Sequence, residues 1–147
     1  MMCTKSPTRL LLASAVLLLL MAAGGCGRVN EAPTLADLLA HPRAHDGKTV
    51  TVEGFYFSGF EISVLAESMG PAPGDPSRTV PQGKLIWVQG ISQEVYDQLH
   101  VQYGTPSGYP ERFGKVRVTG VFEAGSHYGH LDAYDFQLRL TASEAVP

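Results

Sequence analysis

The stretch that decides the fold is residues 46–65, which read DGKTVTVEGFYFSGFEISVL. Over Lys48–Phe57 valines alternate with polar residues, a pattern typical of a β-strand with one buried face. Gly54 interrupts this run, and a glycine inside a strand commonly marks a bulge or a sharp bend. A second apolar run, Phe60–Leu65, follows at once. The stretch therefore predicts a long bent strand, a corner and a second strand.

Three later segments predict further strands of the same sheet. Leu85–Val88 is short and rich in β-prone residues, and Phe136–Leu140 alternates apolar and polar side chains. Lys115–Phe122 repeats the opening theme, including an interrupting glycine at Gly120. Together with the opening pair, these segments predict five strands.

Two helices are expected, each with a hydroxyl at its N-terminus. Thr34 can cap a helix of about two turns that ends before Pro42, and Asp37 suits its first turn. Ser92 can cap a second helix over Gln93–Tyr103, which places this helix between the third and fourth strands.

The remaining segments predict loops. Glu67–Gly83 holds four of the ten prolines and three glycines, which favours a long loop. Thr105–Arg112 and Glu123–Asp135 are expected to be polar connectors, and the tail after Thr141 is expected to fray.

This order of elements favours a mainly β domain over residues 34–147, a five-stranded Greek-key barrel of the OB-fold type. The segment TLADLLAHPRAHDGKTVTVEG resembles the start of OB domains of the tRNA-anticodon-like type. The distal pair, GKVRVTGVFEAG and YGHLDAYDFQLRL, is similar to uncharacterised exported bacterial proteins of that shape. The resemblance implies a fold and an exported location, and it brings no settled activity.

The first 25 residues are expected to be a signal peptide. Lys5 and Arg9 form a basic start, and Leu10–Ala23 is almost wholly apolar but shorter than the ~20 residues of a membrane span. The small residues Gly24 and Gly25 then lead to Cys26, and this arrangement resembles the lipobox of bacterial lipoproteins. The resemblance implies that Cys26 is acylated and that residues 26–33 form a tether. Gly27, in place of an aspartate, implies the outer membrane, with the domain facing the periplasm.

Charge and cysteine content fit an exported, anchored domain. Cleavage would remove Lys5 and Arg9, leaving 9 of 11 basic side chains against 14 acidic ones, a net charge of −5. An acidic domain is a poor partner for nucleic acid. Cys3 would also be removed, so Cys26 would have no disulfide partner within the chain.

One cluster could bind a metal. His127, His130 and Asp132, with Asp135 beyond, bring imidazoles and carboxylates into one short segment, which would suit zinc in a hydrolase that also used Glu61. The competing interpretation is that His130 bonds to backbone carbonyls in a turn and that His127 is solvated. The spacing leaves both interpretations open.

The aromatic residues suggest a binding face. Phe55, Phe57 and Trp87 could contact a sugar, a peptide or a small molecule, although most of the aromatic rings are expected to be core. OB-folds also stack nucleic-acid bases on such rings, but beside a basic groove that is not evident in this chain. No catalytic serine, catalytic cysteine or phosphate-loop motif is present. The sequence thus favours an envelope binding module with no cofactor, whose partner is the membrane plus an unidentified protein, glycan or small molecule.

Overall fold

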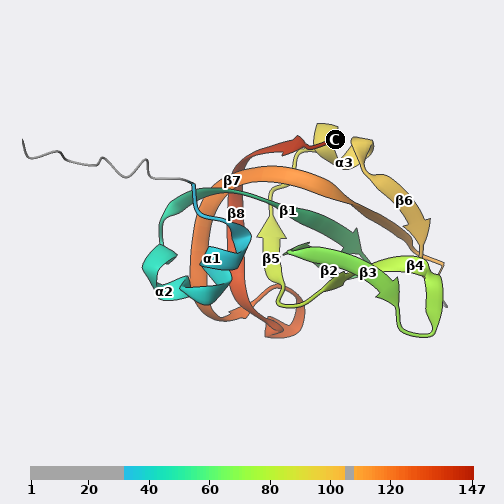
Figure 1. Ribbon diagram of the computed structural model, residues 1–147, viewed down its shortest axis with the longest axis horizontal. Coiled ribbons are helices and arrows are strands. Elements are labelled where there is room, and N and C mark those ends of the chain that lie inside the picture. The colour runs from blue at the N-terminus through green and yellow to red at the C-terminus, as the bar shows by residue number, and fades with distance from the viewer. Residues whose placement is uncertain (1–31, 105–107) are drawn as a thin grey trace, which may run out of the picture. The chain divides into compact units, whose positions relative to one another are not determined.

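The computed structural model describes residues 32–104 and 108–147 and shows a mainly β protein (Figure 1). The predicted signal peptide, the predicted acylation at Cys26 and most of the predicted tether lie outside the described residues. In chain order the elements are α1 (Leu35–Ala40), α2 (Pro42–His45), β1 (Thr49–Gly59), β2 (Ile62–Ala66), β3 (Ser68–Ala72), β4 (Asp75–Gln82), β5 (Ile86–Gln89), α3 (Gln93–Gln98), β6 (His100–Tyr103), β7 (Pro110–Tyr128), the 3-10 helix η1 (His130–Asp132) and β8 (Tyr134–Ala145).

Five strands close into a ring. β1 pairs with β2, β2 with β5, β5 with β8, β8 with β7, and β7 returns to β1. The β5–β8 pair is parallel and the other pairs of the ring are antiparallel. β6 adds to β7 as a sixth strand, and β3 and β4 form a separate two-stranded sheet. The core inside the ring includes Val52, Tyr56, Leu65, Val118, Phe122 and Leu138.

The expected count of five strands is wrong, because the described residues contain eight. The largest difference is the predicted loop 67–83, which forms the β3–β4 hairpin. Thr79 bonds through its backbone N–H and C=O to the side chain of Gln102, so its peptide groups face away from β3. Pro71 lies opposite Thr79, and Pro81 is two residues further on, so both also face outward. A missing N–H costs no ladder hydrogen bond at such positions.

The second predicted helix is also shorter than expected. Ser92 caps α3 as predicted, by accepting a hydrogen bond from the Val95 backbone N–H at 3.3 Å. The helix ends at Gln98, however, because the buried Leu99 takes an extended conformation. The following residues pair with β7 as strand β6, so tertiary pairing overrides the helical tendency of this segment.

Strands β7 and β8 are longer than predicted. β7 begins at Pro110 and runs through the expected connector to Tyr128, leaving only a short loop with η1 before β8. The tail after Thr141 does not fray as expected, because Val116 of β7 lies opposite Ala145.

The two glycines singled out in the sequence have different roles. The β7–β8 register shifts between Thr119 and Gly120, as a bulge there requires. At Gly54 the pairing of β1 with β7 is unbroken, so no bulge occurs there. A Cβ at Gly54 would instead lie 2.9 Å from side-chain carbons of both Leu35 and Leu65. Gly54 therefore lets α1 and β2 pack closely against β1.

The first helix forms as predicted. Thr34 Oγ1 accepts a hydrogen bond from the Asp37 N–H at 3.1 Å, and the Asp37 carboxylate accepts one from the Thr34 N–H at 2.9 Å. This reciprocal capping box fixes the start of α1. Leu35 and Leu38 are buried in the core. Within the described ranges, no helix combines the length and apolarity needed to cross a membrane.

Candidate functional site

The predicted aromatic residues lie in or beside one row across three strands. Phe57 of β1 lies opposite Val64 of β2, and Val64 lies opposite Trp87 of β5. Phe57 is only 2% exposed and Val64 is fully buried, yet neither belongs to the core inside the ring. Strand β3 contacts β1, and β4 contacts both β1 and β2, so the hairpin packs against these two strands. Phe57 is therefore not accessible to a ligand, whereas Phe55 and Trp87 are half-buried.

A polar network fixes the hairpin over this face. Arg78 of β4 donates two hydrogen bonds to the buried Glu111 carboxylate of β7, one of them from Nε at 2.8 Å. Gln102 of β6 donates to the same carboxylate at 2.9 Å and also bonds to the Thr79 backbone. The hydrogen bonds from Arg78 lower the pKa of Glu111 below its ordinary value, against the opposing effect of burial. Glu111 is thus held ionised where the hairpin meets the barrel.

Trp87, on β5, lies at the other end of this row on the outer face. Its ring packs against Tyr134 with centroids 5.2 Å apart. Gly129 lies so close that a Cβ there would be 2.6 Å from both rings. The Trp87 Nε1 group is buried and, among the described residues, has no hydrogen-bond acceptor. Burial raises the pKa of the Tyr134 phenol. The two rings therefore form an aromatic wall between β5 and β8.

The predicted metal cluster does not assemble. His130 Nε2 lies 3.0 Å from Glu61 Oε2, so this histidine pairs with the turn between β1 and β2. His127 and Asp132 are exposed. In the part of the chain that the structure describes, no three His, Cys, Asp or Glu side chains lie close enough to hold a metal ion. The structure brings Glu61 and His130 together, but not the three residues proposed as ligands.

Backbone strain is concentrated in the two segments joined by the Glu61–His130 pair. Over the described ranges, four residues other than glycine have positive φ, and all lie in these segments: Glu61, His127, Leu131 and Asp132. Such conformations cost roughly 1 kcal/mol or more each and persist only where the surroundings impose them. Leu131 is also 85% exposed. The surrounding contacts, such as those of Gly129 with Trp87 and Tyr134, therefore hold the loop between β7 and β8 in a defined shape.

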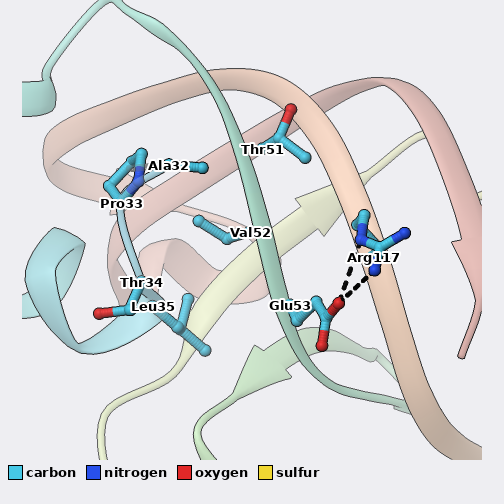
Figure 2. Close-up of a pocket in the computed structure, with 8 residues that line it drawn as sticks. All are labelled: Ala32, Pro33, Thr34, Leu35, Thr51, Val52, Glu53 and Arg117. Carbon is cyan, nitrogen blue, oxygen red and sulfur yellow. Dashed lines mark hydrogen bonds and ion pairs between the residues drawn. The ribbon is translucent and has the colours of Figure 1, made fainter. Parts of the chain in front are cut away.

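A groove of about 310 Å³ lies between the chain entering α1 and strand β1 (Figure 2). Pro33, Leu35 and Val52 line its apolar part. Its charged groups already have partners, since Glu53 pairs with Arg117 at 2.6 Å (Figure 2) and with Lys115 at 3.0 Å. These two cations lower the pKa of Glu53, with the Lys115 hydrogen bond as the largest cause. The groove thus offers little unsatisfied polarity to a ligand.

A second hollow, of about 260 Å³, differs in this respect. We call it the β5–β8 cleft; its lining consists of Lys84, Leu85, Ala133, Tyr134, Asp135 and Phe136. Lys84 and Asp135 are exposed, and neither has an ion-pair or hydrogen-bond partner for its side chain within the described residues. Tyr134 joins the cleft to the aromatic wall formed with Trp87. The cleft therefore combines apolar walls with two free charges of opposite sign.

The sequence alone indicates only part of this site. It identifies Trp87 as a candidate and places Asp135 beside a possible metal cluster, but it does not single out Lys84. The local signal is a charged residue at the beginning of each of two apolar runs. The parallel pairing of β5 with β8, which brings those beginnings together, cannot be read from local pattern.

Comparison with known proteins adds no candidate activity. The chain matches no protein-family model, and neither a curated protein nor a solved structure matches it.

Proposed function

We propose that this protein is a lipid-anchored binding module of the bacterial cell envelope. The observation that carries the proposal is the order of features along the chain. A basic start and an apolar run end in small residues at Cys26, and α1 of a folded domain begins at Leu35. Two or more acyl chains on Cys26 would anchor the domain stably, because a single chain binds a bilayer only marginally.

We further propose that the domain is an OB-type barrel with two additions. The five strands of the ring, in chain order, are β1, β2, β5, β7 and β8, and we number them 1 to 5. Around the ring they lie in the order 1-2-3-5-4. Helix α3 lies between the third and fourth of them, as in OB-folds. The β3–β4 hairpin is then an insertion between the second and third strands, and β6 is an extra strand that pairs with the fourth. This assignment supports a binding scaffold but does not identify a ligand, because fold does not imply function.

Binding is favoured over catalysis by the chemistry of the exposed groups. The β5–β8 cleft offers the aromatic rings of Tyr134 and Phe136 and two charges that no described side chain pairs, and these groups can orient a ligand. Both side chains of the Glu61–His130 pair are partly exposed to solvent. No nucleophile is bonded to the pair in the described part of the chain. Nucleic acid is disfavoured, since the outer faces of β1 and β7 pair their cations with carboxylates.

Metabolic labelling with a radioactive fatty acid tests the anchor. The full chain, expressed in a Gram-negative bacterium, should be labelled and recovered with outer membranes after density separation. Cys26→Ala should abolish both the label and the membrane recovery while leaving the domain folded. A wild-type chain that is unlabelled, or that stays in the soluble fraction, would overturn the proposed anchoring.

A further inference from the structure

We infer that the β5–β8 cleft binds a small zwitterion, a molecule that carries both a free ammonium and a free carboxylate, such as an amino acid or a short peptide with free ends. The inference rests on the proposed function, because it names the ligand class of the binding module. Lys84 would bind the carboxylate, Asp135 would bind the ammonium, and the ring of Tyr134 would contact the apolar part.

Charge is the first argument. Several charged side chains on the strands pair with a charge of opposite sign on a neighbouring strand, as Glu53 does with Arg117 and Glu123 with Arg139. Lys84 and Asp135 line the same hollow but do not pair with each other or with any other described side chain. A ligand with one charge of each sign would satisfy both groups at once. An ion of a single charge would leave the second group unsatisfied and would meet a like charge.

The shape of the cleft is the second argument. The apolar walls are formed by Leu85, Tyr134 and Phe136. The Phe136 ring stacks on the core residue Phe122, with ring centroids 5.9 Å apart. The volume of about 260 Å³ lies near the lower limit of ligand pockets, which span ~300–1,000 Å³. The cleft therefore suits a molecule of one or two amino-acid residues better than a long glycan or a nucleic acid.

Preorganisation is the third argument. Gly83, with φ of +82°, directly precedes Lys84 and directs the chain into β5. On the other side, Leu131 and Asp132 hold left-handed conformations just before Ala133 begins the second wall. A site whose walls are fixed before binding loses less conformational entropy when the ligand arrives. The strained loop between β7 and β8 thus acquires a role, which is to position Tyr134 and Asp135.

The molecule contains its own reporter for this site. Trp87 is the only tryptophan of the chain, and it packs against Tyr134, which lines the cleft. The full chain in detergent micelles would be titrated with leucine while Trp87 emission is recorded. N-acetylleucine, which lacks the ammonium, and leucinamide, which lacks the carboxylate, are the matched probes. Leucine should give a saturable change, and each analogue should bind more weakly by a factor of up to about five, the scale of one partly exposed ion pair.

Two variants assign the charges. Lys84→Met should remove the preference for leucine over leucinamide, and Asp135→Asn should remove the preference over N-acetylleucine. Lys48→Met and Glu94→Gln make the same kinds of charge change outside the cleft and should keep both preferences. All four variants should retain the wild-type melting temperature, so that a loss of binding is not a loss of folding.

Each result decides the matter. Leucine without a saturable signal, analogues that bind as well as leucine, or cleft variants that keep both preferences would each overturn the zwitterion site. Failure here with Cys26 still acylated would leave the proposed anchored module standing. Leucine binding by a chain that is not acylated would sustain the site and remove the anchor.

Discussion

Replacing Gly120 with alanine is the sharpest test of how the barrel closes. Gly120 lies on β7 at the register shift, where the β8 backbone comes close to it. A Cβ added there would be 2.8 Å from the Arg139 carbonyl carbon, 2.9 Å from the Leu140 Cα and closer still to the Arg139 carbonyl oxygen. All three atoms belong to the backbone, so no side-chain rotation can relieve the clash.

The size of the effect follows from these contacts. Ordinary contacts of a Cβ lie at 3.4–4 Å, so β8 would have to move away from β7 by more than half an ångström. Overpacking of this kind typically costs about 1–3 kcal/mol, and the rigid backbone neighbours place Gly120→Ala near 3. The loss of chain entropy in the unfolded state returns about 0.4–1 kcal/mol. The net loss of about 2–3 kcal/mol corresponds to a fall in melting temperature of roughly 10 °C for a domain of this size.

Gly125 provides the matched control on the same strand. A Cβ there would meet the Tyr128 hydroxyl at 3.1 Å, which is the far end of a half-buried side chain that can move. Gly125→Ala carries the same entropic gain in the unfolded state, so it should be neutral or stabilising by about 0.5 kcal/mol. Thermal unfolding followed by circular dichroism compares the two variants directly. If Gly120→Ala and Gly125→Ala have the same melting temperature, the close approach of β7 and β8 is refuted.

Three further predictions concern other parts of the fold. Phe57→Ala should lower the free energy of unfolding by about 3–5 kcal/mol in chemical denaturation, because the ring is buried; a change below 1 kcal/mol would mean that the ring is accessible. Thr34→Ala should cost about 1 kcal/mol by removing the cap of α1, and an unchanged melting temperature would contradict the capping role. Because the pKa of Glu111 is lowered in the folded state, its pairing with Arg78 should stabilise the protein above pH ~4.3, the unfolded pKa, and lose this effect as pH falls through the folded pKa. Melting curves of Glu111→Gln should lack that acid-dependent component, and a wild-type pH profile in this variant would exclude the assignment.

The parts of the fold that sequence could predict are those whose signal is local. The alternation in β1 predicts a strand because Val50 and Val52 both face the core. The capping box of α1 lies within four consecutive residues, so the spacing of Thr34 and Asp37 predicts it directly. The serine that caps α3 is equally local. In each case the residues that form the structure are also the residues that carry the signal.

The hairpin could not be predicted in this way, because its stability depends on distant partners. Taken alone, a segment with Pro71 and Pro81 reads as a loop. It forms β3 and β4 because Gln102, on β6, bonds to the outward-facing backbone of Thr79, and Arg78 reaches the buried Glu111. Neither partner is close in sequence. The hairpin packs against β1, and Phe57 of β1, an aromatic residue predicted to bind a ligand, is buried on the face outside the core.

The cleft was missed for a related reason, and its position follows from the topology. Within the described sheet, β5 and β8 are the one parallel pair. Parallel neighbours begin at the same end, so Lys84 and Asp135, which precede or open these strands, meet there although separate loops deliver them. Those loops can change in sequence without disturbing the core, which lies inside the ring and is built from other residues. A ligand site at this end therefore costs the barrel little stability. The strained residues Leu131 and Asp132 lie in the loop beside the site and not in the core.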